Sequence, residues 1–102
     1  MTQQLGNPDN IDVEWDESKN RLNQREHEGI TFEEAATVFF DPLAIATPDD
    51  EHADEENRFH IIGESALGRM LVVTYMERRD KIRLISARRP TRGERREYEE
   101  GD

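Results

Sequence analysis

Short runs of apolar residues, the first of them alternating with acidic residues, occur at five places along the chain. A period of two is typical of a half-buried β-strand. The expected strands cover residues 11–15, 43–47, 59–62, 70–75 and 82–87. The segments that separate the last three strands are of hairpin length. The pattern therefore predicts an antiparallel meander in the second half of the chain.

Two helices are expected between the first two strands. Asp16 can cap the first helix, which runs to about His27, and its few apolar residues predict a position at the surface. Thr31 opens the second helix, because a threonine followed three residues later by Glu34 forms a capping-box pattern. Apolar residues recur there with helical spacing until Pro42, which forbids continuation of the helix.

A third helix is expected at the C-terminal end of the chain. Pro90 breaks the last strand, and the capping-box pattern from Thr91 to Glu94 opens a helix through Tyr98. The element order β-α-α-β-β-β-β-α predicts an α+β fold, with an antiparallel sheet packed against the two N-terminal helices and followed by the C-terminal helix. One core is expected to contain Trp15, Phe32, Phe39, Ile62, Val72 and Leu84.

The composition suits a single domain with a modest core, since 33% of the 102 residues are apolar and 37% are charged. We expect a mobile lead-in over residues 1–10 and one domain over 11–102. The chain has no cysteine, which excludes disulfides, thiolate zinc sites and thiol nucleophiles. No apolar run is long enough to span a membrane, and the first ten residues are too polar for a secretory signal, so a soluble cytoplasmic protein is expected.

Charge is distributed unevenly between the two halves of the chain. Residues 1–57 contain three basic and 16 acidic residues, a net charge of −13, whereas residues 58–102 contain 11 basic and eight acidic residues, a net charge of +3. The total of −10 therefore hides a basic half. Local fields decide what a surface binds, so a basic ligand-binding face competes with the simpler interpretation that the charges are solvated.

Several arginines of the second half are expected to gather on one sheet face. Arg83 projects from the middle of the last predicted strand, with Ser86 on the opposite side. Arg88 follows at the end of this strand, and Arg58 begins a neighbouring one. Guanidinium groups bind phosphates through two points, so such a cluster would suit an anionic ligand. The alternative is that each arginine pairs with a nearby acid, such as Glu56, Glu77 or Glu94.

Common catalytic and ligand-binding motifs are absent from the sequence. Residues 63–68 do not match G-x-S-x-G, and the acidic segment 48–56 lacks the ligand spacing of an EF-hand and is interpreted as solvated. The histidines His27, His52 and His60 lie far apart in the sequence. No glycine-rich phosphate-binding loop is present. We therefore expect neither a metal site nor a cofactor.

Two ordered sets of residues cover residues 13–98. The first contains Val13–Asp16, Lys19, Asn23, His27–Gly29, Phe32–Ala35, Val38–Phe39 and Asp41–Pro42. The second contains Glu56–Phe59, Ile62–Gly63, Leu71–Val73, Ile82–Arg88, Glu94–Arg95 and Tyr98. No single motif is diagnostic, but this order resembles that of the BrnT family of toxins.

The resemblance implies a RelE-like fold and the toxin half of a type II toxin–antitoxin pair. Such a toxin is an endoribonuclease that inhibits translation and is neutralised by a small BrnA-like antitoxin. The antitoxin carries the DNA-binding part, so operator DNA is contacted through it, and the toxin usually acts as co-repressor within a heterotetramer.

The residues available suit metal-independent RNA cleavage, because RNA carries its own nucleophile in the 2′-hydroxyl group. Arg58 and Arg88 are assigned to phosphate stabilisation, and Tyr98 to positioning a base or phosphate. Glu56 and His60 are the candidates for proton transfer. The residues expected to contact RNA are Lys81, Arg83, Arg89 and Arg92.

Two other functions remain open from the sequence. The first is an inactive module that binds an antitoxin-like repressor, which the net charge of −10 favours because RNA binding depends on phosphate contacts. The second is a stand-alone regulatory protein. Direct DNA binding ranks below both, since no helix-turn-helix with a basic recognition helix is evident.

Overall fold

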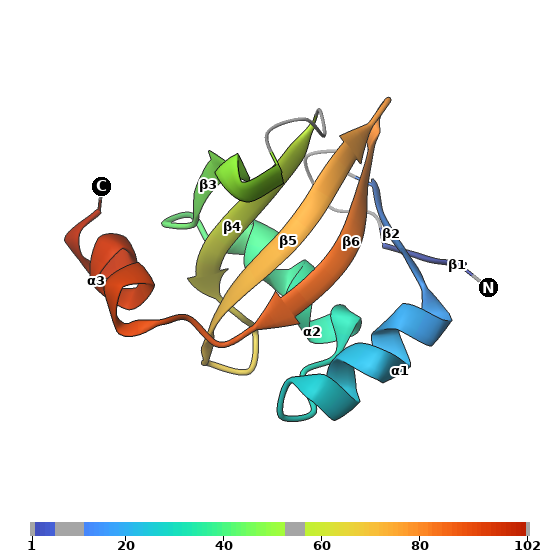
Figure 1. Ribbon diagram of the computed structural model, residues 1–102, viewed down its shortest axis with the longest axis horizontal. Coiled ribbons are helices and arrows are strands. Elements are labelled where there is room, and N and C mark those ends of the chain that lie inside the picture. Colours follow the sequence, from blue (N-terminus) through green and yellow to red (C-terminus); the bar gives the residue numbers. More distant parts are fainter. Residues whose placement is uncertain (1, 6–11, 53–56, 102) are drawn as a thin grey trace.

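The computed structural model describes residues 2–5, 12–52 and 57–101, which form one twisted sheet and its helices (Figure 1). The strands are β1 (Thr2–Leu5), β2 (Asp12–Asp16), β3 (Ile45–Pro48), β4 (Arg58–Glu64), β5 (Met70–Arg78) and β6 (Lys81–Arg88). The helices are α1 (Glu17–Glu26), α2 (Phe32–Thr37) and α3 (Arg92–Glu100), with 3₁₀ turns η1 (Val38–Phe40) and η2 (Asp50–His52). The predicted α+β class is confirmed.

The strand order across the sheet is β1-β2-β6-β5-β4-β3. Strands β3 to β6 form the predicted antiparallel meander, but β2 runs parallel with β6, so the expectation of a wholly antiparallel sheet is wrong. In addition, β1 pairs with β2 and adds a strand that the apolar pattern did not predict. Periodicity identifies a strand but not its partner, and β2 and β6 are far apart in the sequence. The mobility of residues 1–10 stays a prediction.

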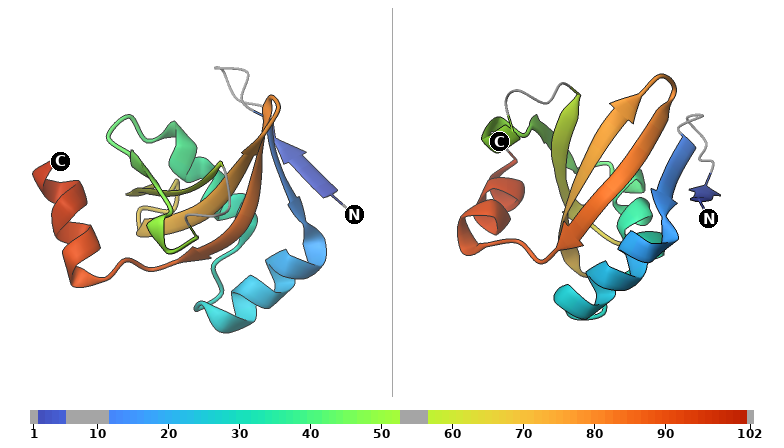
Figure 2. Two further views of the ribbon diagram at one scale, coloured as in Figure 1. Left: turned by 45° about the horizontal axis from the view of Figure 1, so that its top comes forward. Right: turned by 45° about the vertical axis from the view of Figure 1, so that its right-hand side comes forward.

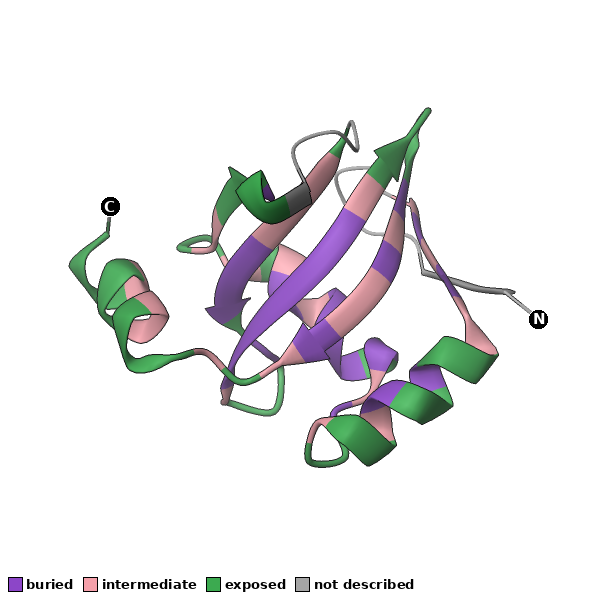
Figure 3. Cartoon of the chain, in the orientation of Figure 1, coloured by how far each residue is buried: buried purple, intermediate pink, exposed green. Residues whose placement is uncertain are grey.

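The main core lies between the sheet and the helices α1 and α2, and Figure 3 shows buried residues in purple on both the strands and these helices. Trp15 and Phe32 meet edge to face with their ring centroids 6.2 Å apart. Leu84 is buried in the same cluster, and Phe39 packs against it. These four residues confirm part of the core expected from the sequence.

Ile62 and Val72 do not belong to this core. With Met70 they form a second, smaller cluster, against which Tyr98 of α3 packs. Their register neighbours show that they point to the other face of the sheet. The prediction of a single shared core was therefore wrong for these two residues. A run of apolar residues long enough to fill a whole strand does not reveal which side chains face which way.

Helix α1 is anchored by buried amides rather than by apolar side chains. Asn23 donates to the carbonyl oxygens of Ile30 and Ala87 and accepts from the backbone N–H of Ala87 at 3.0 Å. β2 pairs with β6 only over residues 81–83 of β6. Beyond that stretch, Asn23 provides the hydrogen-bond partner for the N–H and the carbonyl oxygen of Ala87 in β6. The predicted surface position of α1 is thus correct for most of its residues, while Asn20 and Asn23 are buried.

A bulge in β6 decides which face its arginines occupy. Tyr75 lies opposite Leu84 and Thr74 opposite Ser86, so Ile85 is an extra residue in β6. Ser86 and Arg88 therefore share a face with Arg83, and the prediction that Ser86 lies opposite to Arg83 is wrong. We call the sheet face away from α1 and α2 the open face. It carries Arg58, His60, Thr74, Arg83, Ser86 and Arg88.

Candidate active site

A hollow of about 400 Å³ lies on the open face, between the start of η2 and the start of α3. Its lining includes Asp49, Arg58, His60, Thr74, Arg88 and Glu94. The antiparallel register of β4, β5 and β6 brings these side chains together from separate parts of the sequence. Three of the residues that the sequence pointed to, Arg58, His60 and Arg88, thus line one hollow.

Asp49 is the buried centre of this hollow, with a side chain only 2% exposed. One carboxylate oxygen accepts from Nε of Arg58 at 2.9 Å, and the other lies 3.2 Å from Nε2 of His60. Backbone pairing holds Asp49 in place, because its N–H donates to the carbonyl oxygen of Arg58. Sequence reasoning missed Asp49 since it treated the whole acidic segment as solvated. No signal in the sequence separates Asp49 from the other acids of this segment, because its place beside Arg58 depends on the pairing of β3 with β4.

His60 is held from both of its ring nitrogens. Its Nδ1 lies 2.9 Å from Oγ1 of Thr74, the residue directly opposite on β5, and its Nε2 faces Asp49. A carboxylate can only accept, so Nε2 carries the proton that faces Asp49. In the neutral ring, Nδ1 is then the acceptor and receives the Thr74 hydroxyl. Both His60 and Thr74 line the hollow, so this accepting nitrogen and the hydroxyl that it binds belong to the wall of the hollow.

Arg88 is fixed beside the start of α3 by a two-point pair with Glu94, with N–O distances of 2.8 and 2.9 Å. Glu94 also completes the predicted capping box by accepting from the N–H of Thr91. The hydrogen bond with Arg88 is the main reason why the pKa of Glu94 falls to about 2, and the same bond raises the pKa of Arg88. The pair with Glu94, an alternative expected from the sequence, therefore coexists with the arginine cluster.

The Glu94 pair predicts acid sensitivity of the fold. The folded-state pKa of about 2 lies below the ordinary 4.5, so the stabilising contribution is complete above pH 4.5 and is lost as the pH falls towards 2. The free energy of unfolding is measured by urea unfolding at pH 5.5 and at pH 2.5, for the parent and for Glu94→Gln. We expect the decrease between the two pH values to be about 1–2 kcal/mol larger for the parent. The glutamine keeps the helix cap, so equal losses in both proteins would contradict this prediction.

Arg83 and Lys81 lie on the open face outside the hollow. Nη1 of Arg83 donates to Glu14 at 3.0 Å, and Nζ of Lys81 lies 3.7 Å from the other oxygen of the same carboxylate. Both side chains follow β6 towards the tip of the β5–β6 hairpin. The structure thus places them along the strand from Arg88 rather than beside it.

The remaining predicted residues lie elsewhere. Tyr98 donates to Asp41 at 2.7 Å, and this bond is the main reason why its pKa is raised to about 12. It does not line the hollow. Arg89 and Arg92 are exposed around the start of α3 and are not among the hollow's lining residues either. Glu56 lies outside the described residues.

Comparison with solved structures and family models identifies the class of protein. The 1.1 Å crystal structure of the Brucella abortus ribonuclease toxin, BrnT, is similar in fold, with a TM-score of 0.59, 21% identity, and coverage of 76% of this chain and 94% of that one. A family model described as ribonuclease toxin, BrnT, of type II toxin-antitoxin system matches residues 15–94. The chain belongs to this family. No curated protein matches it.

The family match confirms the resemblance seen in the sequence. Its range, residues 15–94, contains Arg58, His60 and Arg88 as well as Asp49. Tyr98 lies beyond the end of the match. In the part of the chain that the structure describes, no helix is long and apolar enough to cross a membrane.

Proposed function

We propose that this protein is an endoribonuclease that cleaves single-stranded RNA on its open face, at the hollow lined by Arg58, His60 and Arg88. The observation that carries the proposal is the meeting of two guanidinium groups and one imidazole in one hollow of about 400 Å³. Guanidinium groups suit the negative charge that develops on phosphorus, and an imidazole suits proton transfer near neutral pH. The family's ribonuclease description supports the same reaction class.

In the proposed reaction, the 2′-oxygen of the RNA attacks the adjacent phosphorus. At the same time, the bond between this phosphorus and the 5′-oxygen of the next nucleotide breaks. The substrate hydroxyl takes the place of the Thr74 hydroxyl at Nδ1 of His60 and passes its proton to that nitrogen. The leaving 5′-oxygen takes up a proton, and Glu56, the other candidate for proton transfer, is the proposed donor. The products are a 2′,3′-cyclic phosphate and a 5′-hydroxyl end.

Arg88 retains donors for this task despite its pair with Glu94. A guanidinium has five N–H donors, and three are used by Glu94 and by the carbonyl oxygen of Arg89. The pair therefore orients the group without saturating it. Arg58 uses its Nε for Asp49 and lines the same hollow.

The function is tested with purified protein and a single-stranded RNA oligonucleotide. We expect cleavage that yields 2′,3′-cyclic phosphate ends and continues in EDTA, because the nucleophile is the substrate's own hydroxyl. The matched control carries 2′-deoxyribose at the cleaved position and should remain intact. Cleavage of this deoxy-substituted control, or loss of cleavage in EDTA, would contradict the proposed chemistry.

As the toxin of a type II pair, the protein is proposed to act in the cytoplasm, where RNA cleavage inhibits translation. We propose a BrnA-like antitoxin as its partner, in a heterotetramer that contacts operator DNA through the antitoxin. The net charge of −13 over residues 1–57 favours a partner surface with basic groups, and the exposed Phe40 and Leu43 favour apolar ones. An obligate interface would bury more than about 2,000 Å² in total.

One observation favours an inactive, antitoxin-binding module as a second candidate. Each of the three central arginines is already bound to a carboxylate, Arg58 to Asp49, Arg83 to Glu14 and Arg88 to Glu94. These pairs reduce the positive potential that RNA would meet. A protein that forms a stable complex with the antitoxin but leaves every RNA intact would support this second function.

A further inference from the structure

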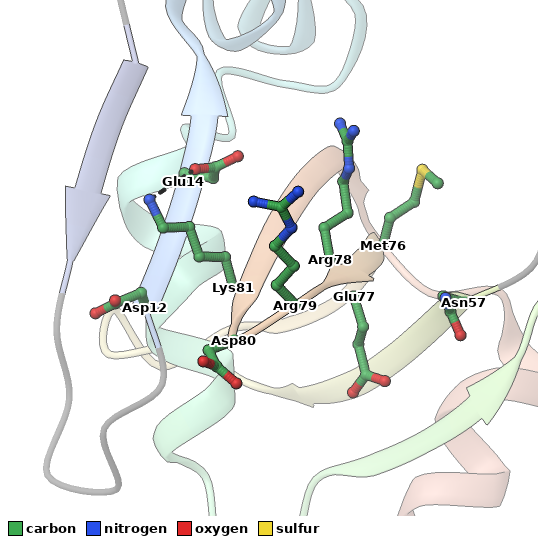
Figure 4. A pocket seen from close by; sticks show the side chains of 9 residues that line it. All are labelled: Asp12, Glu14, Asn57, Met76, Glu77, Arg78, Arg79, Asp80 and Lys81. Carbon is green, nitrogen blue, oxygen red and sulfur yellow. Dashed lines mark ion pairs between the residues drawn. The ribbon is translucent and has the colours of Figure 1, made fainter.

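The tip of the β5–β6 hairpin carries a group of basic side chains that the proposed cleavage site does not use. Arg78, Arg79 and Lys81 line a hollow of about 810 Å³ there, and they project to the same side of the hairpin (Figure 4). The acidic residues Glu77 and Asp80 point to the opposite side in this view. We call Arg78, Arg79 and Lys81 the tip cluster. One side of the hairpin is therefore basic although the whole chain is strongly acidic.

The tip cluster continues the open face. Arg78 lies opposite Lys81 in the register of β5 and β6, and the next pair along the open face is Met76 with Arg83. Side chains two residues apart on a strand share a face. A basic row thus runs along β6 from the tip to Arg83, and Arg88 lies at the other end of the same strand and the same face. In Figure 2, β6 is the darker orange strand and runs without interruption beside β5.

Two arginines of the tip cluster carry unneutralised charge. Arg78 and Arg79 are exposed and form no ion pair with any residue that the structure describes, whereas Lys81 and Arg83 share the single carboxylate of Glu14. The row thus has four positive charges, which outnumber the two acids of β2 that line the hollow at the tip, Asp12 and Glu14. Adjacent unpaired cations repel one another, and a bound polyanion would relieve that repulsion.

The backbone at the tip supports the same conclusion. Arg79 has a φ of 57°, in the left-handed region that favours glycine or asparagine in a two-residue hairpin loop. The pairing of Arg78 with Lys81 closes this turn, but the side chain of Arg79 makes no hydrogen bond or ion pair with a described residue that would offset the strain. Strain of this kind at an exposed position is a reason to look for a ligand.

We propose that the tip cluster is a second phosphate-binding site, which holds the sugar–phosphate backbone of the single-stranded RNA that is cleaved in the Arg58–Arg88 hollow. The inference rests on the proposed function and adds the path of its substrate. From Lys81 to Arg88, β6 extends about 23 Å at about 3.3 Å per residue. At about 3.4 Å per stacked nucleotide, this length corresponds to roughly seven nucleotides.

The length of the path predicts how affinity depends on RNA length. A three-nucleotide RNA fills the hollow but does not reach the tip, whereas a ten-nucleotide RNA reaches both. Binding is measured with 2′-O-methyl oligonucleotides, which lack the nucleophile and stay intact. The test variant is Arg78→Gln/Arg79→Gln. The matched control is Arg21→Gln/Arg25→Gln, which removes the same charge from exposed positions of α1, at the far end of β6 from the tip (Figure 1).

For the ten-nucleotide RNA, we expect the slope of log affinity against log salt to decrease by about 1.4 in the tip variant, since each phosphate contact with a single strand contributes about 0.7. The control variant should keep the parent slope, and all three proteins should bind the three-nucleotide RNA equally. Circular dichroism verifies that both variants are folded.

The result that overturns the inference is distinct from the result that overturns the proposed function. Suppose that the parent cleaves RNA but the tip variant keeps the parent's salt slope, or the control variant shows the same decrease in slope. The tip cluster is then not a phosphate-binding site, and the proposed cleavage site is unaffected. If the parent neither binds nor cleaves any RNA, the proposed function fails and the path fails with it. A smaller slope for the tip variant alone, seen only with the longer RNA, supports the path.

Discussion

Arg88→Ala is expected to reduce RNA cleavage by about a hundred- to a thousandfold while the protein remains folded. Arg88 lies at the end of β6 in the hollow, with a guanidinium held by Glu94 and donors left for a phosphate. Loss of one preorganised donor to a developing negative charge typically costs about 3–4 kcal/mol of transition-state stabilisation. The rate is measured under single-turnover conditions with the oligonucleotide that the parent cleaves.

Glu94→Gln is the control that separates catalysis from structure. It breaks the same ion pair but retains Arg88, and a glutamine can still accept from the N–H of Thr91. We expect this variant to keep most of the parent's cleavage rate, because Arg88 keeps its charge and the side-chain oxygen of the glutamine can still accept from its guanidinium. Equal losses in Arg88→Ala and Glu94→Gln would show that the pair is only structural.

A lysine at position 88 provides a second comparison. Arg88→Lys keeps the charge but loses the planar two-point contact, so we expect it to recover only part of the lost rate.

Full cleavage by a folded Arg88→Ala protein would contradict the assignment of Arg88 to the active site. Circular dichroism and urea unfolding accompany each measurement, since an unfolded variant would imitate a catalytic one.

Asp49→Asn is expected to reduce cleavage by about tenfold to a hundredfold through the position of His60 rather than through a direct contact with RNA. The carboxylate of Asp49 accepts from Nε of Arg58 and lies 3.2 Å from Nε2 of His60, so it sets the position of both side chains. The new amide can instead donate to this nitrogen, which favours the tautomer with a proton on Nδ1. Nδ1 could then no longer accept the substrate proton, and a small displacement of the ring lowers the rate further.

The split between kcat and KM distinguishes this positioning role from a loss of RNA binding. In Asp49→Asn we expect kcat to fall while KM changes little, because the carboxylate acts through the position of the His60 ring. Glu97→Gln is the matched control, since Glu97 is exposed on α3, does not line the hollow, and its replacement removes the same charge. A loss in Asp49→Asn that appears only in KM, or the same loss of kcat in Glu97→Gln, would contradict the assignment of Asp49.

Much of the candidate site could be expected from residue types and their order. Arg58, Arg88 and His60 were singled out because a ribonuclease needs guanidinium groups and a proton-transfer group. Arg58 begins β4, Arg88 ends β6, and His60 lies near the start of β4. Asp49 was not singled out, because nothing in an acidic stretch marks the one residue that becomes buried. Its burial depends on the pairing of β3 with β4, which brings Asp49 back against Arg58.

The two capping patterns show the same division in the helices. Both Thr31 and Thr91 accept from the N–H three residues later, as predicted. At Thr91 the glutamate also completes the box, but Glu34 turns away to a two-point pair with Arg69 and a bond from Ser65. A local pattern therefore predicts where a helix begins, while a partner from a distant segment decides where the charged side chain goes.

By itself, the sequence determined the α+β class, the family and, among the elements that the structure describes, five of the six strands and the three α-helices with their N-caps. These features depend on residues close together along the chain or on their order, which can be read without coordinates. Only the tertiary structure decided that β2 runs parallel with β6, that Ile62 and Val72 face α3, that the bulge at Ile85 brings Arg88 to the face of Arg83, and that Asp49 is buried between Arg58 and His60. Each of these depends on how separate strands and helices meet in space, and no local periodicity contains that information.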